Sequence, residues 1–278
     1  MCCFRLILLS LLASGAALAD GFMLGGGIET DTEDGSSLAL ISGIGIGKDT
    51  WLSAGVAKSS LELRNGRDLE SRYADIELDH NFDPVGIRIG AAYWGDPDVL
   101  ESDDWRASLY FKNARVMLSA DYEFRDFNFI IPSSDFLTSR EIMFDADGIG
   151  ITARFQTSAN SSLRIRSIRY DYSVPFRPIE NVDAARLLSV SRLSLINSLV
   201  DRRASISLGI DQGRNRWEID FSSFEGAINR SRTNSLTLRF LMPMTNKTDI
   251  EFGLGYDDSE LYGDVTFLSL YLYFYAGG

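Results

Sequence analysis

Charged side chains recur at every second position in several segments of the chain, a spacing that places them on one face of an extended strand. One segment carries Asp75, Glu77 and Asp79, and the next two segments carry Arg88 and Arg106. Rings of carboxylate and guanidinium groups around a water-filled passage select permeating solutes by charge. These residues therefore indicate a polar lumen whose chemistry is binding and selection.

The same pattern continues along the chain, with an arginine group on two consecutive segments that a short turn at 158–161 joins. One hypothesis is a segregated arrangement of charge that creates a field across the lumen, and the alternative is pairing of opposite charges across strands, which partly plugs it. The net acidity favours cations, whereas the arginine group favours sugar acids or phosphate locally. The predicted lumen and selectivity residues are Asp75, Glu77, Asp79, Arg88, Arg106, Asp121, Glu123, Arg154, Arg164, Arg166, Glu218 and Asp220.

Catalytic and metal-binding residues are scarce. The chain has 1 histidine, His80, and its 2 cysteines, Cys2 and Cys3, lie at the extreme N-terminus. We interpret His80 as an interfacial anchor at a strand end, the alternative being a general base paired with a serine. The sequence predicts no enzyme, no catalytic residues, no metal site and no cofactor, because a single histidine and two cysteines in a leader that is expected to be removed cannot form a ligand cluster.

A two-residue alternation of apolar and polar side chains runs through most of the chain and must position these charges. In the segment 85–93, Val85, Ile87, Ile89, Ala91 and Tyr93 alternate with small or charged residues. Alternation alone also fits a soluble sandwich, in which one row faces a core and the other faces water. About 14 such segments occur, with 12 to 16 allowed by the pattern, at roughly 18 residues for each strand and its connection, as crossing strands of about 9–11 residues require.

The connections indicate which all-β architecture is present. Short turns alternate with longer, more acidic connections, as in an up-and-down membrane barrel with short turns at one rim and long loops at the other. Two long outer loops are expected, at 132–147 and 174–201. The second has apolar residues at roughly helical spacing over 178–201, which favours a helix. That helix would form a constriction or cover the mouth, and the alternative is a further strand pair.

The N-terminal residues 1–19 resemble a signal peptide, with Arg5, a short apolar run and small residues before Asp20. The run is shorter than a membrane-spanning helix requires. Residues 20–278 are then expected to form a single β-barrel domain in an exported protein. The formal net charge of −12 and the pI of about 4.6 exclude nucleic acid as a partner.

Aromatic residues lie near several strand ends, where membrane barrels carry interfacial girdles. Ordinary strand preference for aromatic residues explains them equally well. The residues concerned are Trp51, Tyr93, Trp94, Phe124, Trp217, Tyr256 and Phe274.

With its leader, its alternating strands and its final apolar-aromatic strand Phe267–Tyr275, the chain resembles a Gram-negative outer-membrane β-barrel protein of the porin type. Members usually end in an aromatic residue that the assembly machinery is thought to recognise, whereas this chain continues with Ala276, Gly277 and Gly278. The resemblance implies a location in the bacterial outer membrane. It also implies as partners membrane lipid and lipopolysaccharide, the barrel-assembly machinery and small polar solutes.

The functional hypothesis is a channel for passive diffusion of small polar or charged solutes through a charge-lined lumen. One alternative is a non-conducting structural or adhesion barrel whose outer loops bind partners, and another is a soluble exported β protein. Whether the apolar row faces lipid or a protein core separates the two membrane-barrel hypotheses from the soluble protein.

Overall fold

In the computed structural model the chain forms a closed, all-antiparallel barrel of 14 strands, in which each strand pairs with its neighbours in sequence. The fold class and strand number expected from the sequence are confirmed. The strands are β1 (Gly21–Asp31), β2 (Gly35–Ile46), β3 (Thr50–Glu62), β4 (Asp68–Asn81), β5 (Val85–Asp96), β6 (Leu100–Lys112), β7 (Val116–Ile131), β8 (Arg140–Ser158), β9 (Ser161–Tyr172), β10 (Val200–Gln212), β11 (Asn215–Gly226), β12 (Arg232–Pro243), β13 (Thr248–Ser259) and β14 (Gly263–Ala276).

The structure describes residues 21–62, 68–96, 99–131, 140–173, 199–227, 230–260 and 263–277. The predicted signal peptide and nearly all of the predicted helix at 178–201 lie outside these residues. In the described ranges, no helix is long and apolar enough to cross a membrane.

The first and last strands close the barrel. Register runs from Phe22 opposite Ala276 to Asp31 opposite Phe267, so the first and last strands pair along most of their length. An even number of strands then places both ends of the barrel domain at the same rim, beside the short turns. Closure removes the exposed sheet edges that otherwise promote aggregation.

Two rims result from the connections. The short-turn rim carries connections of two to four residues: 47–49, 82–84, 113–115, 159–160, 213–214 and 244–247. Gly47 and Gly213 supply positive φ angles of 67° and 65° in two of these turns, a conformation that glycine adopts without strain. The strand ends at the opposite rim, here called the long-connection rim, are joined by three connections of three residues, 32–34, 97–99 and 260–262, and by four longer ones, 63–67, 132–139, 173–199 and 227–231.

Several connections are shorter than the sequence pattern predicts. The predicted outer loop 132–147 is wrong in its second half, because β8 begins at Arg140, and β10 likewise takes in residues 200–201 of the predicted loop 174–201. Strands of 11 to 19 residues replace the expected 9–11. The pattern underestimated them because strands that continue beyond an apolar band carry acidic side chains and therefore resemble loops.

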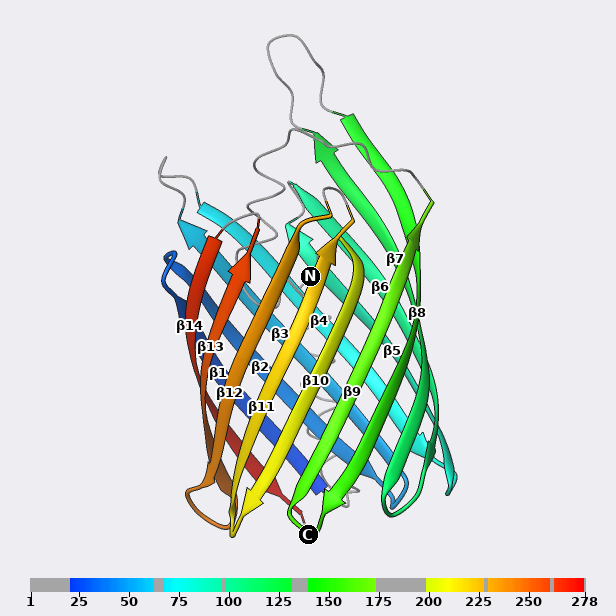
Figure 1. Ribbon diagram of the computed structural model, residues 1–278, viewed down its shortest axis with the longest axis vertical. Coiled ribbons are helices and arrows are strands. Elements are labelled where there is room, and N and C mark those ends of the chain that lie inside the picture. Colours follow the sequence, from blue (N-terminus) through cyan, green and yellow to red (C-terminus); the bar gives the residue numbers. More distant parts are fainter. Residues whose placement is uncertain are drawn as a thin grey trace, which may run out of the picture.

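The barrel wall is uneven in height. In Figure 1, β7 and β8 rise beyond the other strands at the long-connection rim, as their lengths of 16 and 19 residues require. Arg140–Ile131 is the last pair of the β7–β8 ladder. This hairpin builds one tall side of the mouth.

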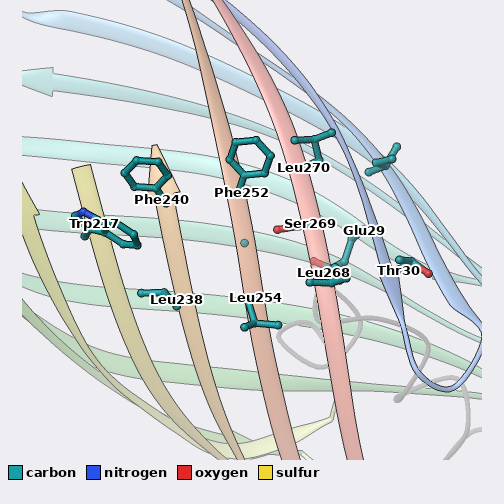
Figure 2. Close-up of a pocket in the computed structure, with 12 residues that line it drawn as sticks. Glu29, Thr30, Trp217, Leu238, Phe240, Phe252, Leu254, Leu268, Ser269 and Leu270 are labelled. Atoms are coloured by element: carbon teal, nitrogen blue, oxygen red, sulfur yellow. The ribbon is translucent and has the colours of Figure 1, made fainter. Parts of the chain in front are cut away.

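Large apolar side chains face outward along the strands. Leu40, Ile87, Ile149 and Leu254 are between 41% and 73% exposed, whereas the alternate positions carry buried polar groups such as Asp121. One outward row crosses β11 to β14 and contains Trp217, Phe240, Phe252 and Leu270 in register, beside an apolar groove (Figure 2). Ser269, the next residue along β14, points away from that row (Figure 2). The orientation expected from the sequence, apolar out and polar in, is confirmed.

A hydrophobic cluster lies inside the barrel near the long-connection rim, on the inward faces of β5 to β9. It contains Trp94, Leu100, Phe127, Phe144 and Ile168, each no more than 6% exposed. The interfacial girdle hypothesis is therefore wrong for Trp94, which packs inside the barrel, and also for Trp51, whose ring lies against inward-facing Gly43. Both tryptophans follow the in–out phase of their strands.

Candidate functional site

The candidate site is the inward face of β4 to β12, where the predicted charged residues gather. The strand phase places all of the predicted lumen residues on this face, because each lies in phase with a buried or half-buried polar row. Their arrangement decides whether the lumen charge is paired or available to solutes.

On β4 and β5, the predicted acidic row meets an arginine. Arg88 donates to Asp79 with Nη2 to Oδ2 at 2.8 Å, and its Nε lies 3.1 Å from Glu77 Oε1. The Tyr110 hydroxyl, on β6, donates to the other Asp79 oxygen at 2.6 Å. Opposite charges therefore pair across β4 and β5, as the alternative of cross-strand pairing predicted.

Glu123 on β7 is the centre of a second network. It accepts hydrogen bonds from Arg166 Nη2 at 2.8 Å, from Arg203 Nη2 at 3.4 Å and from the Tyr170 hydroxyl. Arginines from two strands, β9 and β10, thus contact one carboxylate that is 7% exposed. Nearby, Asp121 accepts from Ser119 at 2.7 Å and from Thr152 at 2.6 Å, so its oxygens are also engaged.

Glu218 on β11 is the centre of a third network. Its Oε1 lies 2.7 Å from Arg239 Nη2 and 3.4 Å from Arg164 Nη2. Asp220, two residues along, accepts from the hydroxyls of Ser207 at 2.5 Å and Ser222 at 2.7 Å. Glu218 and Asp220 are therefore stabilised by arginines on β9 and β12 and by hydroxyls on β10 and β11.

The predicted arginine group divides into paired and unpaired members. Arg166 and Arg164 contact Glu123 and Glu218 respectively. Arg154, directly opposite Arg164 in the β8–β9 ladder, is exposed. In the part of the chain that the structure describes, no carboxylate lies within ion-pair distance of Arg154.

Two inward residues that do not belong to the predicted selectivity set form a buried ion pair. Arg125 Nε lies 3.1 Å from Asp104 Oδ1, and the two side chains are 1% and 2% exposed. Arg106, which the prediction did include, reaches the same carboxylate at 3.5 Å. Asp104 lies in an acidic stretch whose composition resembles a loop, although Ser102, Asp104 and Arg106 follow the strand alternation.

Two neighbouring cavities lie along this side of the lumen and share three lining residues. The deeper one, of about 410 Å³, is bordered by six arginines and by the carboxylates Glu77, Asp121 and Glu123. The other, of about 490 Å³, lies at the short-turn rim and is bordered by five cationic residues and by Asp79 and Asp211. Arg88, Met117 and Arg154 border both cavities.

His80 lies on the outward face of β4 at the short-turn rim. Its Nδ1 is 2.7 Å from Thr50 Oγ1, and its ring packs edge-on against Phe82 with centroids 4.3 Å apart. Among the residues described, no group of three or more histidine, cysteine, aspartate or glutamate side chains is arranged to hold a metal ion. His80 thus lies at a strand end, and its role as an interfacial anchor stays a prediction.

Comparison with known proteins places this geometry in a structural group. No protein-family model and no curated protein matches the chain. Among solved structures, the "CymD monoaromatic hydrocarbon channel" superposes with a TM-score of 0.58 at 10% identity, over 93% of this chain and 88% of that one. A "TodX deltaS2S3 mutant monoaromatic hydrocarbon channel" gives 0.55 at 10% identity, over 93% and 90%.

A loop-deletion mutant of OmpT, an outer membrane protein of Vibrio cholerae, gives a TM-score of 0.51 at 9% identity, over 92% of this chain and 100% of that one. The chain shares its fold with outer-membrane channels. At this level of identity the likeness carries the barrel architecture, and the lumen chemistry must be argued from this chain's own residues.

Proposed function

We propose that the protein is an outer-membrane channel through which small polar or charged solutes diffuse. The observation that carries this proposal is the in–out division of a closed 14-strand barrel: large apolar side chains outside and ionic side chains inside. Only a closed barrel satisfies every backbone amide of a sheet in hydrocarbon. Lipid then covers the apolar row without a protein layer.

The wall chemistry favours polar solutes over the hydrocarbons named for two of the structural neighbours. Both lumen cavities are bordered mainly by arginines, carboxylates and hydroxyls. We propose that the predicted set from Asp75 to Asp220 tunes selectivity, through fixed charges in a wet passage. The ion pairs that arginines form with Glu123 and Glu218 fix the positions of these side chains while solutes pass.

A non-conducting barrel is the second candidate, and one observation favours it. The apolar cluster around Trp94 and Phe127 fills part of the interior near the long-connection rim. In that case the tall β7–β8 hairpin and the outer connections would bind partners. No catalytic role is assigned in either case.

Single-channel recording in planar bilayers tests the proposal. Purified folded protein should give discrete current steps, and unboiled samples should migrate faster than boiled ones on a denaturing gel. Fast unboiled migration without current steps would favour the non-conducting barrel, whereas identical migration would contradict a membrane barrel of either kind.

Export, assembly and lipid contact remain part of the same proposal. The leader 1–19 would be removed after Ala19, the assembly machinery would insert the barrel, and lipid with lipopolysaccharide would surround the outward row. N-terminal sequencing of the protein from purified outer membranes tests the first of these steps.

A further inference from the structure

We propose that Arg154 is the binding contact for small oxyanions, namely carboxylates and phosphate, in the lumen. This inference rests on the proposed channel function and adds to it the class of solute and the residue that holds it. It follows from the position of Arg154, its lack of a partner, and the charge of the cavities around it.

Arg154 borders both lumen cavities, together with Arg88 and Met117, and therefore lies at the boundary between them. It faces inward on β8, with Met117 beside it on β7 and Arg164 beside it on β9. A solute that moves between the two cavities along this wall passes its guanidinium group.

Arg154 also differs from the other inward arginines in its partners. Each of the other inward arginines whose side chain the structure describes has a carboxylate within 4.0 Å, whereas Arg154 has none among the described residues and its side chain is exposed. The nearby acids are engaged: Asp121 accepts from two hydroxyls, and Glu123 accepts from Arg166 and Tyr170. The charge of Arg154 is therefore available to a solute.

The cross-strand neighbour of Arg154 has the same charge. Arg154 and Arg164 are directly opposite in the β8–β9 ladder, and like charges in that position destabilise a sheet unless something compensates them. Arg164 turns toward Ser207 and Glu218, at 3.1 Å and 3.4 Å. An anion bound at Arg154 would neutralise the remaining repulsion.

The surroundings are cationic on balance. Six arginines face three carboxylates in the deeper cavity, and five cationic residues face two carboxylates at the short-turn rim. In that rim cavity Lys112 and Arg115 are exposed and, within the described ranges, have no acidic partner. The local field therefore draws anions from the short-turn rim toward Arg154.

Guanidinium chemistry defines the solute class. Arginine stays charged at all physiological pH values and presents a planar set of donors that matches carboxylate or phosphate in a bidentate fashion. A spherical halide lacks that match. Oxyanions should therefore bind more strongly than chloride at this point of the lumen.

The test uses the full-length folded protein in planar bilayers, with Arg154→Gln compared with Arg169→Gln. Arg169 is an exposed arginine on the outward face of the neighbouring strand, so the control removes the same charge outside the lumen. In a water-like dielectric, a unit charge about 5 Å from a permeating monovalent ion changes the permeability of an anion roughly fourfold and that of a cation roughly fourfold in the opposite sense, so that their ratio changes roughly sixteenfold. We expect that loss of anion-over-cation permeability for Arg154→Gln and none for the control.

Inorganic phosphate and acetate serve as probes. Each should reduce the chloride current of the native protein, and Arg154→Gln should remove that effect while Arg154→Lys retains part of it. Native current with unchanged reversal potential and unchanged phosphate block in Arg154→Gln would overturn the inference and leave the channel function intact. Absence of current from the native protein would overturn the channel function itself, and unboiled gel mobility establishes that each variant is folded.

Discussion

Removal of the Asp104 carboxylate should destabilise the barrel more than any removal of an exposed lumen acid. Asp104 is 2% exposed and accepts from Arg125, which is 1% exposed. The Arg125 guanidinium also lies over the rings of Phe127 and Tyr170, with Cζ 4.9 Å and 5.5 Å from the ring centroids. Asp104→Ala therefore removes a carboxylate that contacts a cation buried beside a hydrophobic cluster.

The structure sets the magnitude by burial. Breaking a buried ion pair on one side destabilises a protein by about 3–5 kcal/mol, because the remaining charge is desolvated. The matched control is Asp211→Ala. The Asp211 side chain is 44% exposed, and its partner Arg216, which is 32% exposed, lies 2.9 Å away. Exposed pairs contribute about 0–1 kcal/mol. The two variants should therefore differ by at least about 2 kcal/mol, the gap between those two ranges.

Urea unfolding of the detergent-folded protein, followed by tryptophan fluorescence, measures the difference. Trp94 is 1% exposed in the same cluster and reports directly on its loss. Replacing both partners, Asp104→Leu with Arg125→Met, should recover most of the lost free energy of unfolding, because buried pairs tolerate replacement by apolar residues. Equal midpoints for Asp104→Ala and Asp211→Ala would refute the claim that burial makes the first pair critical.

Two further predictions concern packing and orientation. Gly86→Ala would place a methyl group against the Tyr110 ring, which the Asp79 hydrogen bond holds in place, and should lower the free energy of unfolding by about 1–3 kcal/mol. The control is Gly21→Ala, because a Cβ there meets nothing within 4 Å. Equal urea midpoints for the two variants would contradict the packing argument. In vesicles, a cysteine at Arg88 should react with a charged water-soluble thiol reagent and a cysteine at neighbouring Ile87 should react only with a lipid-soluble one, and the opposite pattern would show that the barrel is inverted relative to this description.

The sequence predicted the barrel because its evidence is periodic and redundant. Alternation at segments such as 85–93 shows two faces, and closure with an even strand number follows from short turns recurring at one rim. The same evidence predicted the inward position of Asp79, Arg88 and Glu123. These residues keep phase with their strands, and phase is a local property.

Strand ends were predicted less well, for a physical reason. Residues 100–104 and 140–147 are acidic or mixed in composition and resemble loops, yet they belong to β6 and β8. Beyond the apolar band a strand does not need apolar side chains on its outer face, so its composition no longer distinguishes it from a loop. The inward phase still continues there, from Asp121 through Arg125 to Phe127 and Phe129, and following it would have located the apolar cluster.

Pairing inside the lumen was beyond local evidence. Arg154 and Arg164 look equivalent in sequence, but Arg164 reaches Glu218 on β11 and Arg154 reaches no described carboxylate. That distinction depends on the tilt and curvature of the wall, which bring β9 and β11 side chains together across β10. A sequence of alternating residues defines the face of each charge and leaves its partner undefined.

Net charge is equally a poor guide to the lumen. The chain carries −12, which favours cations if charge is averaged over the molecule. Acidic residues gather outside, however: Asp103, Asp126 and Asp145 lie in register on the outward faces of β6, β7 and β8. Solvent and salt screen such external charges within about 8–10 Å, whereas fixed charges bordering a narrow passage act on every permeating ion. The cationic surplus of the two cavities, and not the acidity of the whole chain, should therefore set the sign of selectivity along this wall.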